Sequence, residues 1–368
     1  MALAFVLPRL VFGAGMLREL PSELLLLGIS QPLLISDRGL ERAGVVSTVC
    51  LTAPAIAAVF LDVPENPTAA GADLAVQAYR DGACDGIVAL GGGSVLDTAK
   101  MVAALVAGAA VCAADLIGRS EVIRAVAPLI AIPTTIGTGS ESSPVAALHR
   151  EPGSIAIGTR GAILVPKVAL CDPDLARSLQ RRLIAATAID ALSHCIEGFF
   201  AEPPHPVIDA LALDGIARVF ADVHAALEPD GDAARASIMA AAFAGGAAIH
   251  NGLGPAHAVA LACADQHVHH GTVIGVALPS TTRLLATHFS AKAARVAMAA
   301  GNGNADLGDA LRTLIGSLGL PATLDAAGYQ VGASEALVAA MVASPFNRSS
   351  PYVPTPAEYG AILTGIAG

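Results

Sequence analysis

The chain has 368 residues, 54% of them hydrophobic and only 14% charged, which excludes a disordered protein and predicts large cores or an extensive subunit interface. Its length exceeds what one hydrophobic core usually serves, so we expect two domains. The net charge is −10, and the few lysines form no basic run, which argues against nucleic acid as a partner.

Neither the cysteines nor the apolar segments indicate export or a membrane. The six cysteines are scattered and form no C-x-x-C pair, as is typical of small core residues in a reducing cytoplasm. Pro8 and Arg9 interrupt the N-terminal apolar run too early for a signal peptide. Met239–Ala264 is long enough to span a bilayer, but His250 and Pro255 interrupt it. We therefore predict two buried helices joined by a turn.

The first half of the chain alternates short apolar runs with helical stretches. Such runs, bounded by turn residues, are typical of buried parallel strands. Strands are predicted within Arg9–Gly15, Gln31–Asp37, Ala57–Val63, Gly86–Leu90, Pro128–Ile132, Ser154–Gly158 and Lys167–Cys171, with a helix at Ala69–Asp81. From about Leu175 the chain is rich in Ala and Leu at helical spacing, which predicts an all-helical second domain. The expected domains are residues 1–174 and 175–368.

A run of three glycines follows the strand predicted at Gly86–Leu90. Gly91–Lys100, GGGSVLDTAK, opens an apolar helix expected to reach about Ala114. Residues without a Cβ let the backbone approach an anion, and the free N–H groups and dipole of a helix start favour negative charge. The run lacks the G-x-G-x-x-G fingerprint and the P-loop ending, and a tight turn requiring positive φ is the alternative. We interpret it as a phosphate cradle.

Two further segments fit a dinucleotide. Asp37 ends the strand predicted at Gln31–Asp37, where dinucleotide folds bind a ribose hydroxyl, although Asp before Arg-Gly is also an ordinary turn residue. Pro133–Pro144, PTTIGTGSESSP, offers hydroxyls suited to hydrogen-bonding a nicotinamide, ribose or pyrophosphate. A Ser/Thr-rich linker is the equal alternative for this second segment.

Carboxylate and imidazole groups gather in two stretches of the helical half. In Ile184–Ala201, IAATAIDALSHCIEGFFA, Asp190 and His194 leave the same face of a predicted helix. Burying an Asp on such an apolar face is costly unless a cation compensates its charge. Ala256–Gly271, AHAVALACADQHVHHG, holds four of the ten histidines. Together the stretches predict a divalent metal site, with a hydrogen-bonded Asp–His pair in a core as the alternative.

With GGGSVLDTAK, PTTIGTGSE and DALSHCIEGF in this order, the chain resembles the iron-containing (group III) alcohol dehydrogenase family. The similarity extends from the VFGAG turn to Asn347–Arg348. The resemblance implies an N-terminal Rossmann-like α/β domain, an all-α C-terminal domain, and a metal in the cleft between them. It implies that the metal ligands, which are also the catalytic residues, are Asp190, His194, His257 and His270.

The resemblance also implies the cofactor contacts. Asp37 would bind the adenosine ribose, Gly92, Gly93 and Ser94 the pyrophosphate, and Thr134, Thr135 and Thr138 the nicotinamide side, with Asp97 in the same set. The chain departs from the family in two places. The interval from His257 to His270 is one residue short, which leaves His267 and His269 as alternative ligands. Leu261 occupies the position of a relay histidine found in many members.

These features imply a metal-dependent, NAD(P)-linked alcohol dehydrogenase or carbonyl reductase. Three imidazoles and one carboxylate suit Fe²⁺, favoured by the resemblance, or Zn²⁺, and Asp37 favours NAD over NADP. Phe199, Phe200 and Leu261 predict an apolar pocket for a small alcohol or aldehyde. Arg160 or Arg348 would instead receive an anionic carbonyl such as maleylacetate or a phosphonoaldehyde.

Two other functions remain as alternatives. A lyase of the dehydroquinate synthase kind would require more lysines and arginines around the metal than the helical half provides. A catalytically silent protein that binds nucleotide or metal is compatible with Leu261 at the relay position. For the enzyme, we expect a cytoplasmic homodimer or higher homo-oligomer without nucleic-acid or membrane partners.

Overall fold

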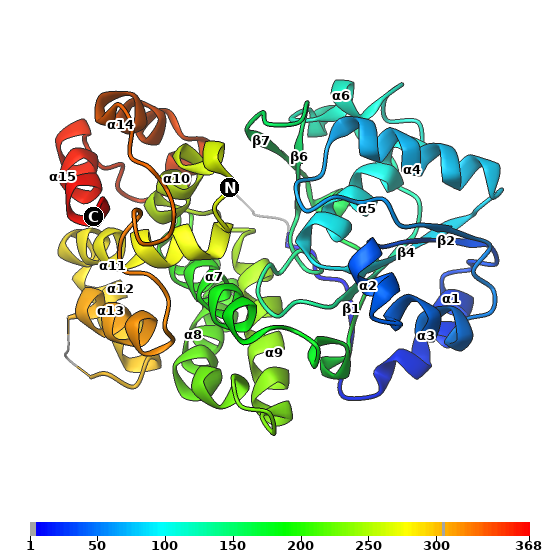
Figure 1. Ribbon diagram of the computed structural model, residues 1–368, viewed down its shortest axis with the longest axis horizontal. Helices are drawn as coiled ribbons and strands as arrows, with labels where there is room; N and C mark the ends of the chain where they lie inside the picture. The colour runs from blue at the N-terminus through cyan, green and yellow to red at the C-terminus, as the bar shows by residue number, and fades with distance from the viewer. Residues whose placement is uncertain (1–4, 304–305) are drawn as a thin grey trace. The chain divides into compact units, whose positions relative to one another are not determined.

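The computed structural model describes residues 5–303 and 306–368, which form two compact units (Figure 1). The first unit contains the chain up to Thr135 together with Ser140–Ser178. The second contains Ile136–Gly139 and the chain from Leu179 onward. The chain therefore enters the second unit twice.

The first unit is built on a six-stranded parallel sheet with the order β1-β8-β5-β4-β2-β3. Its strands are β1 (Arg9–Phe12), β2 (Pro32–Ile35), β3 (Ala58–Phe60), β4 (Gly86–Gly91), β5 (Leu129–Pro133) and β8 (Val168–Cys171). Each lies within a predicted strand or extends it by one residue. Every residue of β2, β4, β5 and β8 is buried, as expected for parallel strands covered on both faces.

Helices cover both faces of this sheet (Figure 1). On one face, α4 (Ala69–Asp81) and α5 (Gly93–Val106) pack on strand residues such as Leu33 and Ile87. On the other face, α1 (Leu20–Leu26) and α3 (Val45–Thr52) pack on the alternate residues, because successive side chains of a strand point to opposite faces. The remaining short helices are η1 (Met16–Glu19), α2 (Arg38–Arg42), α6 (Ala113–Leu116), η2 (Ser120–Val122), η3 (Ala162–Leu164) and η4 (Pro173–Ala176).

Two elements differ from the expectation. Helix α5 ends at Val106, not near Ala114, because Gly108 adopts a left-handed conformation (φ 86°) that terminates the helix. Strand β7 (Ala156–Arg160), near the strand predicted at Ser154–Gly158, does not join the large sheet. It pairs antiparallel with β6 (Val145–His149), a strand that was not predicted.

The arrangement of β2 and β4 marks one edge of the sheet for ligand binding. The two strands are neighbours, but β2 leads to β3 on one side while β4 leads to β5 on the other. Their parallel register pairs Ile35 with Ala89, so the residues that follow, Asp37 and Gly92, emerge at the same edge. Open α/β sheets bind ligands at such a reversal of strand order.

Among the described residues of the second unit, all regular elements are helices. It contains α7 (Arg181–Phe200), α8 (Pro206–Ala226), α9 (Asp232–Ala248), α10 (Pro255–Ala262), η5 (Ala264–Gln266), α11 (His270–His288), α12 (Ser290–Ala299), α13 (Leu307–Ser317), α14 (Ser334–Ala343), η6 (Pro345–Arg348) and α15 (Pro356–Ile366). The two helices predicted within Met239–Ala264 are the end of α9 and α10. Among the described residues, α7 alone is long and apolar enough to cross a membrane, but 94% of its apolar stretch is buried inside the protein.

Candidate functional site

The four side chains predicted to bind metal face one another in the second unit. Asp190 and His194 lie one turn apart on α7, His257 lies in the first turn of α10, and His270 opens α11. Oδ1 of Asp190 is 3.8 Å from Nε2 of His194 and 3.7 Å from Nε2 of His270. The ring of His257 stacks on that of His194, with centroids 5.0 Å apart, and lies 5.5 Å from that of His270. The structure thus brings the predicted ligands together.

Close packing of α11 on α7 places His270 in this cluster. A Cβ on Gly271 would lie only 2.4 Å from the carbonyl oxygen of Ala186 on α7, so this position requires glycine. Of the histidines at positions 267, 269 and 270, His270 is the one whose imidazole lies beside Asp190, and its side chain is 52% exposed. Of the alternatives, His267 is exposed and His269 is half-buried.

The polar atoms of the cluster fit a divalent metal ion. Asp190, His194 and His257 are buried and offer ligand atoms that lie within 4.8 Å of one another. Oδ1 of Asp190 and Nε2 of His257 have no hydrogen-bond partner, which is costly for buried polar atoms. A cation bound among these atoms would satisfy both, and the mixed nitrogen and oxygen donors suit Fe²⁺ or Zn²⁺.

The pKa shifts inside the cluster also favour a bound cation. Burial raises the pKa of Asp190 to about 7, against the opposing effect of His257. Burial also lowers the pKa of His194 well below its usual range, and His257 and His270 add to that effect. The protein alone therefore disfavours charge on both groups, whereas a bound cation stabilises the carboxylate and the neutral imidazole that coordinate it.

Glu197, which the sequence analysis did not single out, is tied to the cluster. It is 2% exposed, and its carboxylate accepts from Nδ1 of His257 at 2.6 Å. Glu197 follows Asp190 by seven residues and His194 by three, so all three project from one face of α7. An acid at this spacing in an otherwise apolar helix was a signal that could have revealed it.

In the first unit, the three-glycine run joins β4 to α5 without a positive φ at any of its glycines. A turn requiring positive φ therefore does not explain them. A Cβ on Gly91 would lie 2.6 Å from the side chain of Val95, and one on Gly92 would lie 3.1 Å from Thr135. Gly92 is the N-cap of α5 and provides no side-chain cap for its N–H groups. Small residues and an uncapped helix start are what an anion site requires.

Asp37 and Ser94 lie where they were expected but already have protein partners. Asp37 is the N-cap of α2, and its Oδ1 accepts from the N–H of Leu40 at 3.0 Å. The hydroxyl of Ser94 donates to the carbonyl of Glu65. Both groups thus shape the edge of the sheet at which β2 and β4 end.

Asp97, predicted to contact the cofactor, joins α5 to the Ser/Thr-rich loop and to β6. Its carboxylate accepts from the hydroxyl of Ser140 and, at 2.9 Å, from the N–H of Ala147. Burial raises its pKa. These contacts hold the loop, and a contact of Asp97 with the cofactor stays a prediction.

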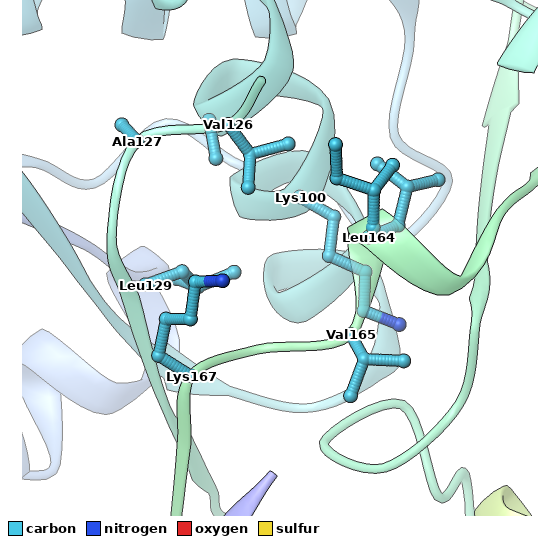
Figure 2. A pocket seen from close by; sticks show the side chains of 9 residues that line it. Lys100, Val126, Ala127, Leu129, Leu164, Val165 and Lys167 are labelled. Atoms are coloured by element: carbon cyan, nitrogen blue, oxygen red, sulfur yellow. The ribbon is translucent and has the colours of Figure 1, made fainter. Parts of the chain in front are cut away.

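Lys100 and Glu141 are buried beside Asp97. Nζ of Lys100 donates to the carbonyl oxygens of Ser143 at 3.0 Å and Val145 at 2.6 Å, and burial lowers its pKa to about 8. Burial raises the pKa of Glu141 to about 7. Figure 2 shows Lys100 with the side chains that line a neighbouring cavity of about 10 Å³, which has room for one water molecule and none for a substrate.

The predicted threonine contacts are divided between the units. Thr134 and Thr135 belong to the first unit, whereas Thr138 lies in the segment Ile136–Gly139 of the second. A Cβ on Gly137 would lie 2.2 Å from the carbonyl oxygen of Thr187 on α7. One on Gly139, whose φ is 63°, would lie 2.5 Å from the backbone of Gly246 on α9. These glycines are explained by close packing on two helices, which an ordinary linker does not require.

The sequence matches two family models in succession. Residues 8–173 match the model described as iron-containing alcohol dehydrogenase, and residues 184–365 match its counterpart for the C-terminal part of the Fe-containing alcohol dehydrogenase family. The chain belongs to the iron-containing alcohol dehydrogenase family, which confirms the resemblance. The fold described above, a parallel sheet with flanking helices followed by an all-helical half, is that of the family.

Individual relatives agree with this assignment. The 4-hydroxybutyrate dehydrogenase of Cupriavidus necator is 34% identical over 99% of both chains. The NAD-dependent methanol dehydrogenase of Bacillus methanolicus is 30% identical over 75% of this chain and 74% of its own. A solved 1,3-propanediol oxidoreductase superposes with a TM-score of 0.92 at 25% identity, covering 99% of both chains.

Proposed function

We propose that this oxidoreductase is a metal-dependent, NAD(P)-linked alcohol dehydrogenase that interconverts a small alcohol and its aldehyde or ketone. The observation that carries the proposal is the buried cluster of Asp190, His194 and His257, whose ligand atoms lie within 4.8 Å of one another and in which Oδ1 of Asp190 and Nε2 of His257 have no hydrogen-bond partner. With His270 beside them, these residues are the proposed ligands of Fe²⁺ or Zn²⁺. When bound, such an ion acts as a Lewis acid on the oxygen of the substrate.

The side chains around the cluster support this role. Burial keeps water from three of the four proposed ligands, Asp190, His194 and His257. The ring of Phe346 packs edge-on against His257 at 5.5 Å between centroids. Exclusion of water strengthens the electrostatic interactions on which polarisation of a carbonyl depends.

The first unit, in this proposal, binds the dinucleotide, and the second binds the metal and the substrate. Uncapped N–H groups at the start of α5 support a pyrophosphate site at Gly92, Gly93 and Ser94, and Asp37 lies at the same edge for the ribose. Thr134, Thr135 and Thr138 remain the proposed residues of the nicotinamide side. A nicotinamide held there would supply the acceptor for the hydride of the alcohol carbon, with the hydroxyl proton released to solvent, and carbonyl reduction would be the reverse.

The decisive experiment is an assay of the purified protein after reconstitution with Fe²⁺ and, separately, with Zn²⁺. NADH and NADPH oxidation would be followed with a panel of small aldehydes and ketones. We expect metal-dependent turnover with at least one carbonyl and a preference for NADH. Absence of turnover under all conditions, with nucleotide or metal still bound, would favour a catalytically silent binding protein.

An ω-hydroxy carboxylate is a second candidate for the substrate. It is supported by the full-length similarity to a 4-hydroxybutyrate dehydrogenase. Comparing 4-hydroxybutyrate with 1-butanol, which has the same chain length and no carboxylate, separates the two substrate classes. A higher kcat/KM for 4-hydroxybutyrate would select the anionic substrate.

We also propose a cytoplasmic homo-oligomer. All six cysteines are free thiols, which supports a reducing compartment. Exposed apolar side chains in the first unit, such as Leu25 at 80% and Leu51 at 82%, support an interface between copies. Light scattering of the purified protein gives the mass that tests this point.

A further inference from the structure

We infer that Glu197 is a positioning residue of the metal site: it fixes the proton of His257 on Nδ1 and so keeps Nε2 available as a metal ligand. The inference rests on the proposed metal-dependent function. It adds to the four proposed ligands a buried carboxylate that acts through one of them.

The hydrogen bonds of Glu197 determine the tautomer of His257. Its Oε2 is 2.6 Å from Nδ1 of His257 and 2.9 Å from the N–H of Gly254, and its Oε1 is 2.6 Å from the N–H of Ala256. An ionised carboxylate only accepts hydrogen bonds, so Nδ1 must carry the proton. The lone pair of the neutral ring is then on Nε2, the buried atom without a partner in the cluster.

The packing around Glu197 fixes its position. A Cβ on Gly254 would lie 3.1 Å from Oε1, so glycine permits this close approach of the backbone. Gly254 is the N-cap of α10, and the N–H groups of Gly254 and Ala256 at that helix start both donate to the carboxylate. Helix α7, which also carries Asp190 and His194, thereby holds the ring of His257 at Nδ1, on the side opposite Nε2, the proposed metal-binding atom.

A purely structural role, in which Glu197 only caps α10, makes a different prediction. Glu197→Gln has nearly the same shape but one carbonyl oxygen in place of two acceptors. Backbone N–H groups cannot accept a hydrogen bond from the new amide, whereas His257 can if its proton moves to Nε2. With the amide nitrogen in the place of Oε2, the ring accepts at Nδ1 and its unprotonated nitrogen turns away from the metal. With the amide oxygen there, a neutral acceptor replaces the charged one and holds the Nδ1 proton less strongly. Both orientations favour the Nδ1 tautomer less than Glu197 does, an effect that a mere loss of capping does not produce.

The first test measures Zn²⁺ affinity of the apo protein by competition with a chromophoric chelator. We expect Glu197→Gln to weaken binding by roughly 10- to 100-fold, as for other partners of ligating histidines. Glu228→Gln, at a carboxylate with a 54% exposed side chain, is the control and should bind as the wild type does. In a His257→Ala background, Glu197→Gln should cause no further loss, because it acts through that ring.

The second test reads the tautomer directly from ¹⁵N spectra of histidine-labelled apo protein. His257 should carry its proton on Nδ1 in the wild type, and the population protonated on Nε2 should increase in Glu197→Gln. An equal further loss of Zn²⁺ affinity in the His257→Ala background, or an unchanged tautomer, overturns the inference. If His257→Ala alone binds Zn²⁺ normally, the metal site itself is wrong, whereas weak binding by His257→Ala with normal binding by Glu197→Gln refutes only the role of Glu197.

Discussion

The guanidinium of Arg38 lies 2.9 Å from the carboxylate of Asp62, and a second nitrogen lies 3.1 Å from Glu41. Arg38 directly follows Asp37, so it is a cation that could compensate a 2′-phosphate at this edge of the sheet. Exposed ion pairs of this kind are weak, but they direct Arg38 toward other acids. In the proposed nucleotide site, the charge of Asp37 would then determine cofactor preference.

We therefore predict a preference for NADH over NADPH. At an effective dielectric near 20 and a separation of about 4 Å, Asp37 would repel a phosphate charge by about 4 kcal/mol before screening. A third of that energy still gives roughly tenfold discrimination in kcat/KM. Asp37→Gly should shift the preference toward NADPH, and Asp62→Asn, which releases one arm of Arg38, should shift it less. Equal kcat/KM for both cofactors in the wild type would contradict this role of Asp37.

The second prediction concerns the metal ligands. His194→Ala and His257→Ala should each lose bound metal and activity together, with a loss of affinity beyond the 10- to 100-fold typical of outer partners. Elemental analysis of the purified variants measures the metal. His224→Ala is the control, because its ring pairs with Ser317 away from the cluster. Normal metal content in both site variants refutes the assignment.

The same experiment identifies the third histidine. His270→Ala should cost more metal affinity than His267→Ala or His269→Ala, since His270 is the one placed beside Asp190. The reverse ranking would identify another member of this group as the ligand.

The third prediction concerns an anionic substrate. Arg348 is exposed and has no ion-pair partner among the residues described, and it lies in η6 with Phe346, which contacts His257. If it binds a substrate carboxylate, Arg348→Ala should raise KM for 4-oxobutanoate about tenfold or more, since hydrogen bonds to charged groups contribute about 1.5–3 kcal/mol. The KM for butanal should be unchanged in this variant. Arg160→Ala, at the second arginine proposed to receive an anionic substrate, is the comparison. Equal effects of Arg348→Ala on the KM for 4-oxobutanoate and for butanal would exclude a contact between Arg348 and the substrate carboxylate.

The fourth prediction is a pH dependence of stability caused by Glu141. Its pKa in the folded protein is raised from 4.5 to about 7 by burial, so the folded state binds more protons between these values. Stability should therefore fall as pH rises through this window, by at most about 3 kcal/mol. Glu141→Gln should flatten this decline in urea-unfolding curves followed by circular dichroism. Glu121→Gln, at an exposed carboxylate, should leave it unchanged, and an identical pH profile for Glu141→Gln would show that Glu141 is not the cause.

The fifth prediction separates packing from backbone strain at glycine. Gly139 and Gly153 both have positive φ, but a Cβ on Gly153 would meet nothing within 4 Å. Alanine at either position carries the left-handed penalty of roughly 1–2 kcal/mol. Gly139→Ala should cost about 1–3 kcal/mol more because it overpacks against Gly246. Thermal unfolding of both variants measures the difference, and equal losses would mean that the contact with α9 relaxes at no cost.

Local signals in the sequence defined most elements of the fold. Helix α4 has the predicted bounds Ala69–Asp81, because Thr68 caps its start and Gly82 follows its end. Helix α5 ends earlier than predicted, at a left-handed Gly108. A single glycine in an apolar run does not show from the sequence alone that it will adopt this conformation. Strand β6 was missed because its stability depends on pairing with β7, and such a partner cannot be recognised from the short run VAALH alone.

The candidate site divides in the same way. Asp190 and His194 were found because their helical spacing is local, and the histidine-rich stretch is conspicuous. Glu197 was missed because its partner His257 lies 60 residues further along the chain. The protein partners of Asp97, Ser140 and Ala147, were also missed, because they lie 43 and 50 residues further along the chain. The type of each residue and its neighbours in the sequence indicated its chemistry. Its hydrogen-bond partner, in contrast, is set by the tertiary fold and could not be predicted.

The excursion of Ile136–Gly139 into the helical unit limits how this protein can be cut or recombined. A fragment beginning at Leu179 would lack the segment that fills the space beside Thr187 and Gly246. A fragment ending at Ser178 would retain Ile136, which is fully buried in the intact protein, without the helices that belong to its unit. A chimera that exchanges the first unit must therefore take these four residues from the parent of the helical unit.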